Sequence, residues 1–197
     1  KLFTGGLRIG VSSRLVKQAL ANYGDVDLEE IEKIWHGLHF PYINLFSWLE
    51  KKGSKPKISM IQDFNQALIH SSKDKIINYE KLEFLGDAVL RLAASDFIEK
   101  KYPQMSVGAR SELRSQIVSD EWLTNLGKKI GIEKVIIKGP KALHDENSKN
   151  TIVGEATEAL IGALYKCFNS IQEVNLWLDD IWEEDSCLLY TSDAADD

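Results

Sequence analysis

The sequence has few cysteines and no long run of apolar residues. Its two cysteines, Cys167 and Cys187, lack metal-ligand spacing, which excludes a disulfide framework and favours a reducing compartment. No apolar run approaches the roughly 18 residues that a membrane span needs, and no signal peptide is visible, although the chain begins at Lys1 and not at a methionine. We therefore expect a cytoplasmic protein with no membrane partner.

An excess of basic residues is also lacking. The 197 residues contain 24 Lys and Arg against 30 Asp and Glu, which gives a net charge of −6. Six of these acids lie in residues 183–197, which hold no Lys or Arg, so residues 1–182 are neutral overall. Overall charge therefore neither supports nor forbids a nucleic-acid substrate, and the location of the charges matters more.

Helical periodicity dominates the chain, without an alternating strand pattern or an internal repeat. We predict an all-α protein in three parts. Residues 1–57 form a helical accessory region, 58–183 form the main domain, and 184–197 are a non-native or disordered tail that resembles translated sequencing-adapter read-through. The first boundary follows a break at residues 53–56, which read Gly-Ser-Lys-Pro.

Several helices are expected from the spacing of the apolar residues. In the accessory region they cover residues 11–23, 27–38 and 41–51. In the main domain they cover residues 61–70, 80–102, 107–119, 120–131 (with Asp120 as the cap and Gly131 as the stop), 151–168 and 171–182. Residues 135–137 form the only strand-like run, and 138–149 are expected to form a loop.

Three acids interrupt the apolar helix that begins at residue 80. Glu80 and Asp87 lie about 20° apart around its axis, and Glu83 lies about 60° from them, so the three share one stripe. Both their mutual repulsion and Gly86, which costs about 1 kcal/mol against alanine, destabilise the helix. A bound cation would offset the repulsion, and close approach of another backbone or of a partner chain would explain the glycine.

A second acidic pair, Glu155 and Glu158, lies on one helical face among small residues that permit close contact between helices. Packing of the two helices would bring this pair together with Glu83 and Asp87. Four clustered carboxylates cannot all remain ionised without a cation. Oxygen ligands without His or Cys select Mg²⁺ or Mn²⁺, which support phosphoryl-transfer chemistry. For either helix alone, a solvated acidic face is the alternative.

The segment EKLEFLGDAVL (residues 80–90) resembles the signature of the ribonuclease III domain. Three further motifs resemble that domain in the same order: ALIHSS (67–72), ELRSQIVSDEWLTNLGKKIGI (112–132) and GEATEALIGALY (154–165). The resemblance extends over about residues 60–182. It implies an all-α homodimer that cleaves double-stranded RNA with a divalent metal, leaving 5′-phosphate and 3′-hydroxyl ends, as in RNA and rRNA processing.

The same resemblance implies roles for the acids. Asp87 and Glu158 correspond to catalytic residues, and Glu80 to an accessory acid of the signature. The ligands of Mg²⁺, with Mn²⁺ as a substitute, correspond to Glu83, Asp87, Glu155 and Glu158. Glu155 stands where the family usually has Asp, which is one methylene shorter. This departure leaves a weak or inactive ribonuclease III-like RNA-binding or ribosome-associated scaffold as an alternative.

Other residues carry weaker signals. RNA-backbone contact is one interpretation of Arg110, Arg114 and Lys149, and an exposed basic surface is the other. Phe84 and Gly86 are candidates for the dimer contact. The histidines His70 and His144 and the five tryptophans are expected to be structural. Val107 replaces an acid that family members often carry, no segment resembles a double-stranded-RNA-binding domain, and a helical interaction module remains the third interpretation.

Overall fold

The described part of the chain is built from helices. The structure is a computed structural model that describes residues 58–143, 145 and 148–193. Its elements are α4 (Ile58–Ala67), α5 (Glu80–Lys101), α6 (Val107–Ile117), α7 (Asp120–Lys129), the 3-10 turn η1 (Ile132–Lys134), α8 (Pro140–Leu143), α9 (Lys149–Phe168) and α10 (Ile171–Asp193). In these ranges no strand forms, and the prediction of an all-α fold is confirmed.

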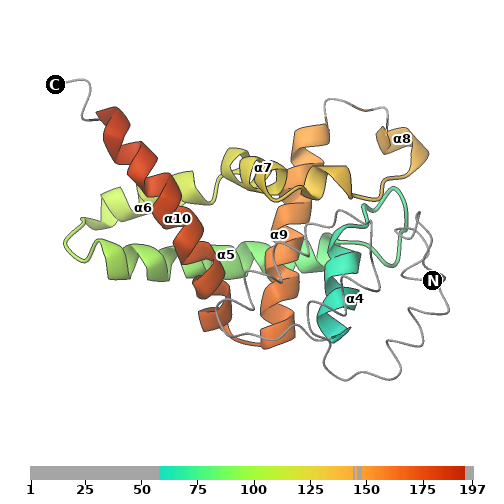
Figure 1. The fold of residues 1–197 in the computed structure, drawn as a ribbon, viewed down its shortest axis with the longest axis horizontal. Coiled ribbons are helices and arrows are strands. Elements are labelled where there is room, and N and C mark those ends of the chain that lie inside the picture. Colours follow the sequence, from blue (N-terminus) through green and yellow to red (C-terminus); the bar gives the residue numbers. More distant parts are fainter. Residues whose placement is uncertain (1–57, 144, 146–147, 194–197) are drawn as a thin grey trace.

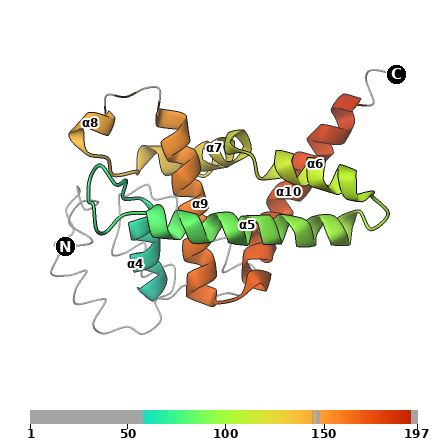
Figure 2. The same cartoon turned by 180° about the vertical axis from the view of Figure 1, so that it is seen from behind.

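Helix α9 lies at the centre of the arrangement. Figure 1 shows it in orange crossing the green α5, and Figure 2 shows the crossing from behind. Between Ile152 and Leu164 nearly every residue of α9 is buried, which agrees with the mostly apolar composition of this segment. Helices α4 and α7 also pack against α9, so its buried faces are covered by several neighbours.

The crossing of α5 and α9 depends on glycine. A Cβ atom at Gly86 would overlap the backbone carbonyl of Glu158, and a Cβ at Gly162 would overlap the carbonyl oxygen of Leu82. The two backbones are therefore in direct contact, as the small residues predicted. Gly86 faces α9 and is buried, so its predicted place in a dimer contact is wrong: the backbone that approaches it belongs to the same chain.

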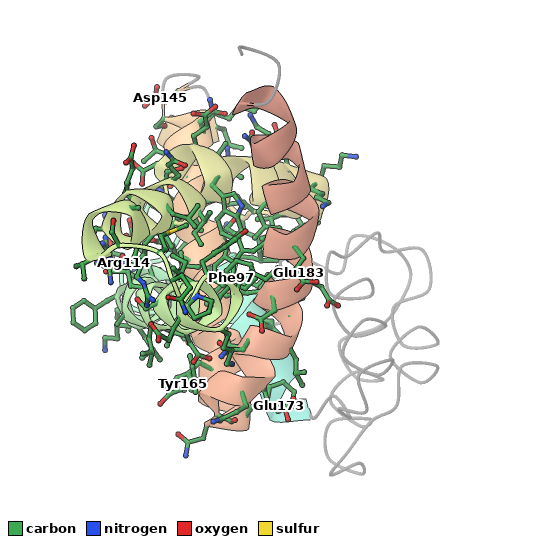
Figure 3. All side chains as sticks on the ribbon, turned by 90° about the vertical axis from the view of Figure 1, so that its left-hand side faces the viewer. Phe97, Arg114, Asp145, Tyr165, Glu173 and Glu183 are labelled. Atoms are coloured by element: carbon green, nitrogen blue, oxygen red, sulfur yellow. The ribbon has the colours of Figure 1, made fainter. Side chains whose placement is uncertain are left out.

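Helix α10 packs across α5 through aromatic residues. The rings of Trp182 and Phe97 lie 5.4 Å apart, and Trp182 Nε1 donates a hydrogen bond of 3.1 Å to the carbonyl oxygen of Ile117. Figure 3 shows Phe97 in the middle of the helices, with Asp145 and Tyr165 toward opposite ends of the molecule. The described tryptophans Trp122, Trp177 and Trp182 are at least partly buried, as expected of structural residues.

Serine hydroxyls begin two of the helices. Ser106 Oγ accepts a hydrogen bond from the backbone of Ala109, and Ser119 Oγ accepts one from that of Trp122. The predicted cap at Asp120 is therefore wrong by one residue, because Ser119 has the extended backbone that a capping residue needs. Gly131 ends this region with φ at 83°, a conformation that glycine adopts without strain.

Several predicted elements differ from the structure. The helix expected at residues 61–70 is α4, which ends at Ala67, and α9 begins at Lys149 instead of at residue 151. The strand-like run contributes only an isolated parallel bridge between Ile137 and Ile69, since no other strand pairs with it among the described residues. The predicted loop contains the short helix α8. Helix α10 continues beyond its predicted end at Trp182 to Asp193, so the first part of the predicted tail has helical backbone.

His70 takes part in the hydrogen bonds of the loop next to this bridge, which agrees with the expected structural role. His70 Nδ1 accepts a hydrogen bond of 3.0 Å from the backbone N–H of Ser72, and Ser72 Oγ accepts one of 3.0 Å from Gly139. His144, Trp35, Trp48 and the predicted accessory helices lie outside the described residues, and the division into three parts stays a prediction. No helix in the described ranges combines the length and apolarity of a membrane span.

Candidate active site

The two acidic motifs meet where α5 crosses α9. Glu83 and Asp87 extend from α5 on either side of Gly86 in the sequence, and Glu155 and Glu158 come from α9. Contact between the backbones of Gly86 and Glu158 places the acidic segments side by side. The prediction that these helices pack together is confirmed, while the function of the acids stays a prediction.

Glu158 lies where a negative charge is disfavoured. Its pKa is raised to about 7, chiefly by burial and then, in decreasing order, by the carboxylates of Asp87, Glu83 and Asp120. Arg91 opposes them, but as the smallest of the causes. Asp87 and Glu158 are therefore close enough to interact electrostatically, and they do not lie on opposite sides of the molecule.

Glu83 behaves in a similar way. Its pKa is raised to about 7, chiefly by burial and then by the carboxylates of Glu155 and Glu80. The predicted accessory acid Glu80 is exposed at the start of α5, where its backbone N–H donates a 3.0 Å hydrogen bond to Asn78 Oδ1. Its main effect within the described part of the structure is thus electrostatic, through its influence on Glu83.

Two of the four carboxylates accept hydrogen bonds from residues that were not among the predicted site residues. Asp87 Oδ1 accepts a 2.7 Å hydrogen bond from Arg91 Nε, and both side chains are largely exposed. Glu155 Oε2 accepts a 2.5 Å hydrogen bond from the hydroxyl of Tyr79, which is 1% exposed. Residues four apart on a helix are neighbours, so the pairing of Arg91 with Asp87 could have been predicted from the sequence. Tyr79 and Glu155 are far apart in the sequence, so their contact could not.

The donor atoms of this cluster are of the type that binds a divalent cation. The donors are carboxylate oxygens, which Mg²⁺ and Mn²⁺ prefer, and the raised pKa values of Glu83 and Glu158 reflect charge that a cation would stabilise. In the described ranges, however, no three acidic, His or Cys side chains converge as a finished metal site. Binding by Glu83, Asp87, Glu155 and Glu158 thus requires their side chains to turn toward a common point.

The three residues predicted to contact RNA have hydrogen-bond and ion-pair partners outside this cluster of acids. Arg110 donates to the carbonyl oxygens of Met105 and Pro103 and pairs with Glu99, so its guanidinium fastens the turn between α5 and α6. Arg114 Nη1 lies 3.0 Å from Ser95 Oγ, and Lys149 Nζ lies 3.2 Å from Glu133. Arg114 is exposed, and contact of any of the three with RNA stays a prediction.

Asp120 is an acid that sequence reasoning treated only as a helix cap. It begins α7, which packs on α9, and its carboxylate contributes to the raised pKa of Glu158. Its backbone carbonyl also approaches Gly154, where the two helices are close. Since it lies 38 residues before Glu158 on another helix, no spacing rule relates the two.

Known proteins are similar to this chain in sequence and in the arrangement of their helices, and they are ribonucleases. A model of the family described as Ribonuclease-III-like matches residues 62–175. The chain is 52% identical over 122 residues to Ribonuclease 3 of Prochlorococcus marinus, covering 62% of this chain and 49% of that protein. It is 40% identical over 114 residues to Ribonuclease 3 2 of a Synechocystis strain, covering 58% and 47%.

Solved structures agree. The nuclease domain of ribonuclease III from Campylobacter jejuni matches with a TM-score of 0.58 and 27% identity, covering 68% of this chain and 94% of that one. Dicer from Pichia stipitis matches with a TM-score of 0.54 and 27% identity, covering 66% and 57%. The chain belongs to the ribonuclease-III-like family. It spans about half the length of the curated relatives it matches.

Proposed function

We propose that this protein is a divalent-metal-dependent endoribonuclease that hydrolyses double-stranded RNA. Family membership supports the reaction class, since the curated relatives carry the name Ribonuclease 3. The observation that carries the proposal is the contact between α5 and α9, which gathers the acids of both motifs at one crossing. A bound cation would stabilise the ionised form of these neighbouring carboxylates.

The proposed metal is Mg²⁺, with Mn²⁺ as a substitute, held by Glu83, Asp87, Glu155 and Glu158. When bound, such an ion activates water and stabilises charge on a phosphodiester, which accounts for 5′-phosphate and 3′-hydroxyl products. In this proposal Asp87 and Glu158 act at the reacting phosphate. The raised pKa of Glu158 supports this, because a positive charge nearby would favour its ionised form.

The proposed substrate follows from the family and not from the charge of the chain. A protein whose Lys and Arg do not exceed its Asp and Glu would bind RNA weakly, and its affinity would still fall as salt rises, because its phosphate contacts are electrostatic. It would recognise A-form shape and 2′-hydroxyl groups instead of sequence. Processing of structured precursors, including rRNA, in the cytoplasm is the corresponding cellular role, and the small number of cysteines supports that compartment.

A homodimer would supply two such sites for the two strands. Phe84 is 84% exposed on α5, next to the acids, and Leu92 on the same helix is 57% exposed. Exposure of large apolar side chains beside a functional cluster favours a protein contact there. The similar nuclease domain from Campylobacter jejuni has a structurally flexible region that is involved in dimer formation, which supports a dimer here as well.

Cleavage of a long RNA duplex tests the proposed activity. The chain is incubated with duplex RNA and Mg²⁺ or Mn²⁺, and product ends are analysed for 5′-phosphate and 3′-hydroxyl. We expect cleavage that falls at least about 100-fold in Glu158→Gln and Asp87→Asn. Glu112→Gln, an exposed acid on α6, is the matched control and should cleave normally.

The second candidate is an RNA-binding scaffold without catalysis. Glu155 favours it, because its extra methylene displaces the carboxylate relative to an Asp at the same position. Duplex binding without cleavage in either metal would support the scaffold and contradict the enzyme. A gain in rate in Glu155→Asp would show that the longer side chain weakens an active nuclease.

A further inference from the structure

Tyr79 is fixed in place more firmly than its position in a loop suggests. Its side chain is 1% exposed, and its ring lies edge-on to His70 with 5.5 Å between the ring centres. Its backbone N–H donates a 2.9 Å hydrogen bond to Ile69, and its carbonyl accepts bonds from Leu82 and Glu83 as α5 begins. Ring and backbone are thus both held, which makes the hydroxyl a rigid donor.

That hydroxyl donates to Oε2 of Glu155 at 2.5 Å, across 76 residues of sequence. Glu155 is one of the acids at the crossing of α5 and α9, and it raises the pKa of Glu83. A glutamate has one more rotatable bond than an aspartate and loses more conformational freedom when its carboxylate is fixed. One hydrogen bond from a rigid donor removes much of that freedom in advance.

We propose that Tyr79 is a positioning residue for the metal site: its hydroxyl fixes one oxygen of Glu155 and leaves the other for the cation. This inference rests on the proposed function. It adds to the proposed site a residue that lies outside the acidic motifs and whose hydroxyl reaches the longer side chain of Glu155. A tyrosine that merely satisfies its own buried hydroxyl would occupy the same place, so the two roles must be separated by experiment.

These two roles of Tyr79 are distinguished by measuring the binding of Mn²⁺ to the protein without RNA. The electron paramagnetic resonance signal of the free ion reports how much Mn²⁺ is unbound. Removal of a group that orients a metal ligand typically weakens metal binding by about 10- to 100-fold. We expect the Kd for Mn²⁺ to rise about tenfold in Tyr79→Phe, which keeps the buried ring. Tyr165→Phe is the control, since Tyr165 lies toward the far end of α9 (Figure 3). Thermal melting without metal confirms that each variant is folded.

The same substitution in a Glu155→Asp background isolates the hydrogen bond. The aspartate carboxylate is one methylene too short to meet the hydroxyl, so Tyr79→Phe should change the Kd by less than about twofold there. An equal loss in both backgrounds would show a general structural effect and overturn the proposal. So would an unchanged or tighter Kd in Tyr79→Phe alone, since a tighter one means that Tyr79 holds Glu155 away from the ion.

A second measurement needs no substitution at Tyr79. The chain has six tyrosines, and 3-fluorotyrosine labelling with Tyr→Phe changes at the other five assigns the Tyr79 fluorine resonance. We expect this resonance to shift as Mg²⁺ saturates the protein, and a resonance that does not move overturns the inference. If the parent chain binds Mn²⁺ and cleaves RNA, failure of these tests rejects only the proposed role of Tyr79. If the parent chain does neither, the proposed function is rejected as well.

Discussion

The backbone of Gly86 lies directly against the carbonyl group of Glu158, with no room for a side chain between them. We predict that Gly86→Ala destabilises the protein by about 3 kcal/mol, because the added methyl group forces α5 away from α9. Gly108 on α6 has no atom within 4 Å of a Cβ built there. Gly108→Ala is therefore the control, and it should change stability by at most about 1 kcal/mol. Chemical denaturation measures both, and equal stabilities of the two variants would contradict the close crossing.

Stability without a divalent metal should depend on pH through the acids at the crossing. The pKa values of Glu83 and Glu158 are raised to about 7 in the folded state from 4.5. A carboxyl with a higher pKa when folded binds its proton more tightly in that state, so stability falls as the pH rises from about 4.5 to about 7. Since both side chains are partly exposed, the expected loss is on the order of 1 kcal/mol each.

Thermal melting in EDTA at several pH values checks this prediction. Glu158→Gln should melt with a smaller decrease between pH 5 and pH 7.5 than the parent chain, and Mg²⁺ should stabilise the parent more at the higher pH. The exposed Glu112→Gln serves as the control. If Glu158→Gln follows the parent at every pH, the buried charge at this position does not limit stability.

Phe84 should affect association and not folding. Because its side chain is 84% exposed, Phe84→Ser leaves the core intact, and we expect the melting temperature of the monomer to change little. The proposed dimer should dissociate at concentrations where the parent remains paired, as measured by sedimentation velocity. Val107→Ser, which alters another exposed apolar residue, should keep the parent's association. A parent that is already monomeric would contradict the dimer.

Cys167 should be inert toward thiol reagents. Burial and the carboxylate of Asp63 raise its pKa to about 12, so almost no thiolate is present near neutral pH. We predict that iodoacetamide at pH 8 modifies it at least about 100-fold more slowly in the folded than in the unfolded protein. Mass spectrometry of the peptide that contains Cys167 distinguishes it from the other cysteine. Rates within tenfold of each other would contradict the described environment.

Helix positions were predicted well where local signals fix them. The expected starts of α5 at Glu80 and of α6 at Val107 agree with the structure, and so does the stop at Gly131. Apolar spacing, capping serines and glycine act within a few residues, so they are readable without knowledge of the fold. The cap at Ser119 was missed because serine and aspartate both cap helices, and only the backbone conformation separates them.

Burial was less predictable than helix positions. Leu82 and Val89 of the apolar helix α5 are buried, but Leu92 on the same helix is 57% exposed. Which part of α5 is covered depends on where α9 and α10 cross it, and no spacing within α5 contains that information. For the same reason, the sequence could not decide whether Gly86 contacts another backbone of the same chain or a partner chain.

The order of the residues was enough to predict the all-α class and the family and to single out four acids whose types and spacing suit a hard cation, because these depend on residues that are near one another along the chain. Only the packing of the helices showed that Gly86 meets Glu158 and that Tyr79 holds Glu155. Contacts between residues more than 70 positions apart follow from how helices pack in space, and packing is set by the shapes of all the surfaces that meet.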